Sequence, residues 1–260
     1  MPHDRRSDPI FVGYLPTPKK DHVFLKTILP LLLILTAIVA AAVSTEQPNP
    51  GTGVWDTGHE LKLEGQLVPG PYPILRVKDS ERTAGIRTWL LAEQGKIGVQ
   101  NRVTALGVTG PTDVIARGYR IERDGQGMLE LIAGANALVI SETQTTSMPE
   151  QEKTPRKHVS ITGEIIDPKC WLGVMKPGFG KPHKACATLC IEGGIPPMFI
   201  WINESGSRTR ALLLGPNGEQ IVDRIRSRIA DPITIEGNLE TWDDLHVLKV
   251  DAEETAIRSH

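Results

Sequence analysis

The sequence predicts a mainly β protein in which an N-terminal transmembrane helix precedes two small five-stranded barrels. Three observations lead to this prediction. One stretch near the N-terminus is uncharged and apolar over a length that can cross a bilayer. The remaining chain consists of short apolar runs separated by Gly, Pro, Asn and Asp, which is typical of strands and turns. These runs occur in the same order twice, which indicates an internal duplication.

The first 44 residues are expected to form a tail and a membrane span. Residues 1–22 are polar, contain several Pro and basic residues, and are expected to be a disordered cytoplasmic tail. Residues 23–44 form the expected transmembrane helix, which carries no charge from Thr27 to Ser44 and whose Lys26 can snorkel towards the interface. Basic residues precede this span and acidic residues follow it, so the positive-inside rule places the N-terminus in the cytoplasm.

A cleaved signal peptide is the alternative interpretation of this segment. The small residues Ala40, Ala41 and Ala42 would suit a cleavage site. The basic leader and the apolar core are both long for a signal peptide, which favours an uncleaved anchor. Both interpretations export the remaining chain. We therefore predict a single-pass protein of the cell inner membrane, with the bulk of its chain in the periplasm or another extracytoplasmic space.

Residues 45–57, which contain Pro and Gly, are expected to be a linker, and residues 58–140 are expected to be the first barrel. Alternating and short apolar runs, together with the turn pair Asp124-Gly125, predict five strands. One helix, over Val99–Leu106, is predicted before the last hairpin. The predicted strands are Leu61–Val68, Ile74–Lys78, Thr88–Ala92, Val114–Arg123 and Met128–Ile132.

Residues 141–157 are polar, lack a periodic apolar pattern and are expected to link the two barrels. Residues 158–260 are expected to be the second barrel. Its amphipathic helix, predicted over Glu219–Ile229, again precedes the last hairpin. The predicted strands are His158–Asp167, Met198–Ile202, Arg210–Leu214, Pro232–Trp242 and His246–Asp251.

Alignment of the two halves locates an insertion in the second one. Gly65 and Gly163, each inside a first strand, are 98 residues apart, whereas Leu91 and Leu214 in the third strands are 123 residues apart. The extra residues include all three cysteines, so residues 168–197 are predicted to be an insertion. The order of the elements resembles the OB fold, a five-stranded Greek-key barrel. This resemblance implies an OB-like architecture with ligand binding beside the loop after the first strand, and it implies no activity.

The insertion carries the residues with metal-binding chemistry, in the order Cys170, His183, Cys186 and Cys190. If residues 183–191 form a short helix, the last three share one of its faces. The Gly- and Pro-rich loop can then bring the first cysteine back to that face. Thiolates and imidazole are ligands of zinc and of Cu(I). We therefore predict that these four residues bind one copper or zinc ion.

The spacing Cys-x12-His-x2-Cys-x3-Cys differs from that of zinc fingers, which pair their ligands as Cys-x2-Cys. The Cys-x3-Cys pair is similar to that of copper chaperones of the Sco type and of dinuclear copper centres, although the strand patterns of those proteins are absent. Met175 and Asp167 could supply a further ligand. The string GEIIDPKCWLGVMKPG, continued by HKACATLCIEGGIPP, is similar to the signature of an uncharacterised family of membrane-anchored bacterial proteins. This resemblance names neither an activity nor a cofactor.

Two other uses of the cysteines stay open. A disulfide between Cys170 and either Cys186 or Cys190 would staple the insertion to the barrel and leave one thiol over. A redox-active thiol pair is the second alternative, because Lys181 and Lys184 precede the cysteines of the expected helix and would favour a thiolate.

The composition and the motifs limit the functional classes. A net charge of -2, no basic stripe and only 5% aromatic residues argue against a nucleic-acid partner. No Ser-His-Asp, phosphate-loop, HExxH or CxxCH pattern is present, which favours a protein that is not an enzyme. The predicted function is metal binding or electron transfer by a membrane-anchored accessory protein of an envelope complex. The alternatives are a non-catalytic assembly module with a disulfide-stapled insertion and a saccharide binder.

Overall fold

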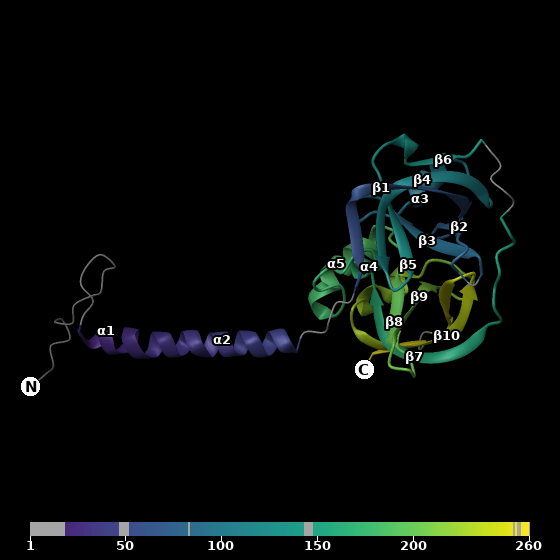
Figure 1. Cartoon of the computed structure of the whole chain (residues 1–260). Coiled ribbons are helices and arrows are strands. Elements are labelled where there is room, and N and C mark those ends of the chain that lie inside the picture. The colour runs from purple at the N-terminus through teal and green to yellow at the C-terminus, as the bar shows by residue number, and fades with distance from the viewer. Residues whose placement is uncertain are drawn as a thin grey trace, which may run out of the picture. The chain divides into compact units, whose positions relative to one another are not determined.

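A computed structural model describes residues 19–46, 52–82, 84–142, 148–251, 253 and 256–259. The chain forms two compact units, Met1–Asn49 and Pro50–His260. We call the second the two-barrel unit (Figure 1).

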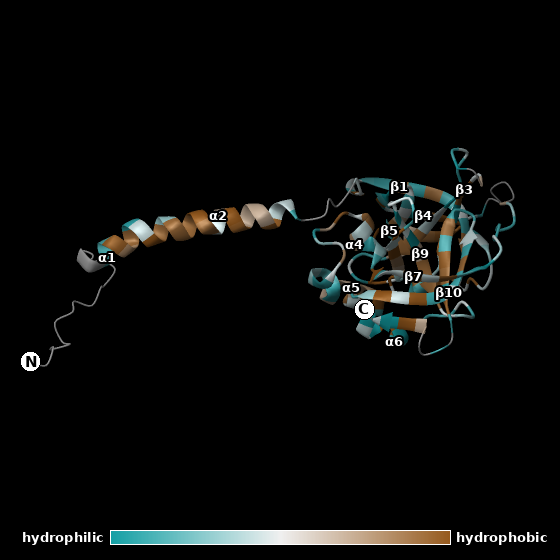
Figure 2. Cartoon of the chain, turned by 90° about the horizontal axis from the view of Figure 1, so that it is seen from below, coloured by the Kyte–Doolittle hydropathy of each residue, from teal (hydrophilic) through white to brown (hydrophobic). Residues whose placement is uncertain are grey.

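The N-terminal unit contains one long apolar helical segment. It begins with helix α1, continues through a π-helical turn and ends with α2, along which Figure 2 shows apolar residues. Residues Asp21–Thr45 are long and apolar enough to cross a membrane, and a signal sequence could have the same properties. Most of the predicted tail lies outside the described residues. The bounds are α1 (Lys19–Val23), the π-helical turn (Phe24–Ile28) and α2 (Leu29–Thr45).

The first barrel closes in the strand order β1-β2-β3-β5-β4, because β4 also pairs with β1. Strands β3 and β5 are parallel, and the other neighbours in the closed barrel are antiparallel. Helix α3 (Gln100–Ala105) precedes the last hairpin, as predicted. The strands are β1 (Val54–Val68), β2 (Ile74–Lys78), β3 (Ile86–Ala92), β4 (Thr112–Arg123), β5 (Gln126–Leu131) and β6 (Leu138–Ile140).

The second barrel repeats this topology in the order β7-β8-β9-β11-β10, closed by the pairing of β10 with β7. Its helix α6 (Val222–Ile225) is shorter than predicted, since a 3₁₀ turn (Arg226–Arg228) follows it. The strands are β7 (Lys157–Ile166), β8 (Met198–Ile202), β9 (Arg208–Leu214), β10 (Pro232–Trp242), β11 (Leu245–Val250) and β12 (Ile257–Ser259).

The prediction of a mainly β chain with two closed five-stranded barrels is confirmed. Several strand bounds differ from the sequence pattern by a few residues. Strand β1 starts at Val54, inside the range expected to be a linker, and the three-residue strands β6 and β12 were not predicted. Strands this short do not contain enough residues for an alternating pattern to be recognised. The domain boundaries remain predictions.

The glycines that reveal the duplication occupy equivalent places. A Cβ on Gly65 of β1 would lie 2.2 Å from the carbonyl oxygen of Arg76 on β2. A Cβ on Gly163 of β7 would lie 2.2 Å from the carbonyl oxygen of Ile200 on β8. Each first strand therefore needs glycine where the second strand comes closest to it.

The two barrels bind each other through the tips of their last hairpins. The tip of the β10–β11 hairpin contacts the first barrel, where Asp243 accepts two hydrogen bonds from Arg76, at 2.7 and 3.1 Å. In the same way, the backbone oxygen of Asp124 at the β4–β5 tip accepts a 2.7 Å hydrogen bond from Arg210 of β9. An apolar cluster with residues of both barrels fills the space between them. It includes Ile74, Leu90, Met128, Met198, Leu212 and Val247.

Candidate metal centre

The cysteine-containing insertion lies between β7 and β8 and consists of two short helices. Helix α4 (Pro168–Leu172) follows β7 directly, and α5 (Lys184–Glu192) precedes β8. Asp167 is the N-cap of α4, because its Oδ1 accepts a 2.9 Å hydrogen bond from the backbone N–H of Cys170. Proline at the first helical position supports the same start, since it has no N–H to satisfy.

The second helix begins one residue later than expected. A 3₁₀ turn over Lys181–His183 leads into α5, so His183 stands immediately before the helix, and Cys186 lies in its first turn. His183 and Cys190 are buried, whereas Cys186 is partly exposed. Met175, which the sequence offered with Asp167 as a possible further ligand, is 46% exposed.

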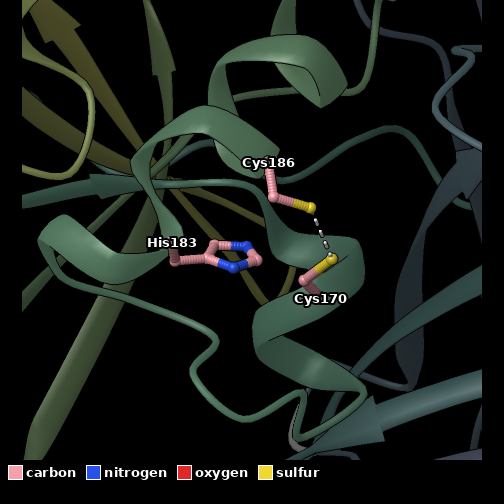
Figure 3. Close-up of side chains that lie close together, drawn as sticks. All are labelled: Cys170, His183 and Cys186. Atoms are coloured by element: carbon pink, nitrogen blue, oxygen red, sulfur yellow. Dashed lines mark hydrogen bonds between the residues drawn. The ribbon is translucent and has the colours of Figure 1, made fainter. Parts of the chain in front are cut away.

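The four predicted ligands come together in two overlapping groups of side chains. The ligand atoms of Cys170, His183 and Cys186 lie within 4.8 Å of one another, and so do those of Asp167, Cys170 and Cys190. Cys170 belongs to both groups, so the loop does return it to α5, and its Sγ lies 3.9 Å from Sγ of Cys186. Figure 3 shows the imidazole and these two sulfurs pointing towards a common space between α4 and α5. These Cys, His and Asp side chains could hold a metal ion.

A carboxylate orients the histidine. Nε2 of His183 donates a hydrogen bond of 2.8 Å to Oδ2 of Asp167, and both side chains are buried. A carboxylate partner favours the tautomer with the proton on Nε2, in which the other ring nitrogen, Nδ1, keeps a lone pair that can bind a metal. Metal-bound histidines commonly have such a carboxylate partner, which fixes the tautomer and raises the basicity of the ring.

A lysine from the first barrel reaches the cysteines. Nζ of Lys96, in the loop between β3 and α3, donates to Sγ of Cys186 at 2.7 Å and to Sγ of Cys190 at 3.6 Å. The hydrogen bond to Cys186 raises the pKa of Lys96, so its ammonium stays charged beside the sulfurs. The hydrogen bond from Cys170 and this ammonium lower the pKa of the Cys190 thiol. The same contact with Cys190, together with burial, raises the pKa of the Cys170 thiol.

The first barrel also holds the insertion in place. The buried ammonium of Lys169 in α4 donates to the backbone oxygens of Glu93 and Gly95, both at 2.7 Å. It also pairs with the carboxylate of Glu130 on β5 at 2.6 Å. These three partners belong to the first barrel, so the candidate metal centre is fixed from both barrels.

Replacing Gly193 by alanine is expected to loosen the insertion. A Cβ there would lie 1.8 Å from the backbone oxygen of Lys96, and neither backbone can give way freely. We expect a loss of about 1–3 kcal/mol in the free energy of unfolding, as for other overpacked positions. Urea unfolding followed by tryptophan fluorescence measures it. Gly110→Ala is the matched control, because nothing lies within 4 Å of its Cβ; equal unfolding midpoints for the two variants would contradict the prediction.

Two features of the centre were not expected from the sequence. The Asp167-Pro168 pair is a helix-start signal that could have indicated the N-cap, but nothing local indicated the bond to His183. Lys96 lies 90 residues from Cys186 in the chain, and no pattern connects them.

No protein-family model, characterised protein or solved structure matches this chain significantly. The resemblance of the cysteine-containing string to an uncharacterised family therefore receives no support from known proteins.

Proposed function

We propose that this chain is a membrane-anchored, extracytoplasmic protein that binds one copper or zinc ion through Cys170, His183, Cys186 and Cys190. In this proposal it serves a membrane complex by handling the metal or by transferring electrons through it. The observation that carries the proposal is that these side chains form two overlapping groups which share Cys170, with the imidazole oriented by Asp167. Soft thiolates with imidazole are suited to Zn²⁺ and Cu(I) and poorly suited to Mg²⁺ or Ca²⁺.

The state of the cysteines supports metal binding over a structural disulfide bond. All three thiols are free, and Sγ of Cys170 lies 3.9 Å from Sγ of Cys186, too far for a disulfide bond. The insertion needs no disulfide to hold it, because Lys169 and the apolar cluster between the barrels already fix α4. Among the described residues, Asp167 is the one carboxylate in either group, beside three thiols and an imidazole.

The N-terminal segment supports the proposed location. Asp21–Thr45 has the length and the apolar composition of a membrane span, and basic residues precede it. A metal centre that is held near a membrane surface would meet membrane proteins by diffusion in two dimensions. That arrangement suits an accessory protein that gives a metal ion or an electron to a membrane complex.

Metal analysis tests the proposal. The full chain, purified in detergent under reducing and anaerobic conditions, is expected to contain about one zinc or copper ion per chain, as one such ligand set binds one ion. The variant Cys170→Ser is expected to lose that ion, because Cys170 belongs to both groups of side chains. The control His59→Ala should keep it, since His59 is strongly exposed and pairs with Asp56 instead.

Two results would contradict the proposal. One is a wild-type chain without stoichiometric metal after it has been offered both ions. The other is a Cys170→Ser variant that binds as tightly as the wild type. A chain with one disulfide, one free thiol and no metal would favour the assembly module.

A further inference from the structure

We propose that the metal-free protein exchanges thiols with external disulfides, with Cys186 as the attacking thiol and Cys170 as the resolving thiol. The substrate class is a disulfide of a small peptide or of an extended protein segment. This activity does not rest on metal binding, because it needs only the reduced and empty arrangement of the two sulfurs.

The exposure of the two thiols supports this assignment. Cys186 is partly exposed in the first turn of α5, whereas Cys170 is 6% exposed behind it. An external disulfide can therefore reach the first sulfur and not the second. The sulfurs lie 3.9 Å apart, so rotation of the side chains can bring them to bonding distance.

Lys96 provides the charge that such an attack needs. Its ammonium donates a 2.7 Å hydrogen bond to Sγ of Cys186, which places a positive charge directly beside the attacking sulfur. Lys96 is itself exposed, so a disulfide can approach the same place from solvent. Cys190 also lies near this ammonium, at 3.6 Å. Because Cys190 is only 1% exposed, an external disulfide cannot reach its sulfur.

The reaction consists of two balanced steps. The Cys186 thiolate attacks one sulfur of the external disulfide, a mixed disulfide forms, and the other half leaves as a thiolate that takes up a proton. The Cys170 thiol then loses its proton and attacks Sγ of Cys186, which releases the second half as a thiol. The protein loses two electrons and two protons, and the external disulfide gains both.

The test uses glutathione disulfide as the probe. The reduced full chain in detergent, freed of metal with a chelator, is mixed with the probe, and the products are identified by peptide mass mapping. We expect two glutathione molecules released per chain and a Cys170–Cys186 disulfide. In Cys170→Ser we expect the reaction to stop at a glutathione adduct on Cys186. Lys96→Met is expected to slow the first step on the order of tenfold, through loss of a charge-assisted hydrogen bond.

Lys62→Met is the matched control for Lys96→Met, since it removes a surface lysine that pairs with Glu64, and it should react as the wild type does. Cys186→Ser should form no adduct although it keeps two thiols, and it therefore tests the proposal even if Cys170→Ser fails to fold. A first adduct on Cys170 or Cys190, a product disulfide that contains Cys190, or no reaction of the folded reduced chain would overturn the proposal. Metal content is measured on separate reduced samples, so failure of this activity leaves the proposed metal site untouched, and the reverse also holds.

Discussion

Replacing Arg76 by methionine is expected to lower the free energy of unfolding of the two-barrel unit by about 3–5 kcal/mol. Arg76 and Asp243 form an ion pair at 2.7 Å across the two barrels, and each side chain is 2% exposed. Removal of the guanidinium leaves the Asp243 carboxylate buried at the tip of the β10–β11 hairpin without a compensating charge. Breaking a buried pair in this way costs far more than losing an exposed one. Urea unfolding followed by tryptophan fluorescence measures the loss.

A double variant separates the ion pair from the packing of the arginine stem. In Arg76→Met with Asp243→Asn, this pair leaves no buried charge without a partner, and we expect the double variant to recover much of the lost stability. Asparagine also tolerates the positive φ of 52° at this position. The surface control is Lys62→Met, whose partner Glu64 is 49% exposed, and it should change stability by less than about 1 kcal/mol. If the double variant loses as much stability as the two single variants together, the charges of Arg76 and Asp243 are not coupled and the prediction is wrong.

Replacing Asp167 by asparagine is expected to weaken metal binding by about 10- to 100-fold while the fold stays intact. The asparagine Oδ1 can still accept from the backbone N–H of Cys170, and asparagine is as good an N-cap as aspartate. Its amide N–H₂ now faces Nε2 of His183, where the carboxylate oxygen had accepted a hydrogen bond. The imidazole is then favoured in the tautomer with the proton on Nδ1, which removes the nitrogen available to the metal.

Competition with a chromophoric zinc chelator measures the affinity, and the urea midpoint of the same sample measures the fold. The control Asp231→Asn changes a carboxylate that pairs with Lys184 of α5 at 2.5 Å but belongs to neither group of side chains. It should leave the affinity within about threefold of the wild type, because a partly exposed pair contributes little. If Asp167→Asn binds zinc as tightly as the wild type, the hydrogen bond to His183 has no part in metal binding.

Most of the fold could be predicted because its signals are local. Alternation along β7 and the turn pair Asp124-Gly125 each depend on residues in one strand or one turn. The duplication is visible because such local patterns occur twice, as the glycines Gly65 and Gly163 in the two first strands show. The helix over Glu219–Ile229 was predicted too long, because its later residues form a 3₁₀ turn that packing, rather than periodicity, decides.

The candidate site was predictable only in part. The helical spacing of His183, Cys186 and Cys190 placed them on one short segment, and the loop composition allowed Cys170 to return. Cys190 nevertheless groups with Cys170 and Asp167 rather than with His183. A spacing of seven residues leaves two side chains two helical turns apart, so the axial distance along α5 separates what the shared face suggests.

The sequence by itself determined the class of the protein: an apolar N-terminal segment, a duplicated β architecture and one insertion that carries all the thiols. These features follow from periodicity, turn residues and composition, which act over a few residues. Only the tertiary structure decided that Lys96 of the first barrel contacts the cysteines of the second barrel and that Asp167 forms a hydrogen bond with His183. Such contacts depend on how two closed barrels dock, and the docking is set by the buried Arg76–Asp243 pair and the apolar cluster between the barrels, which join residues far apart in the chain.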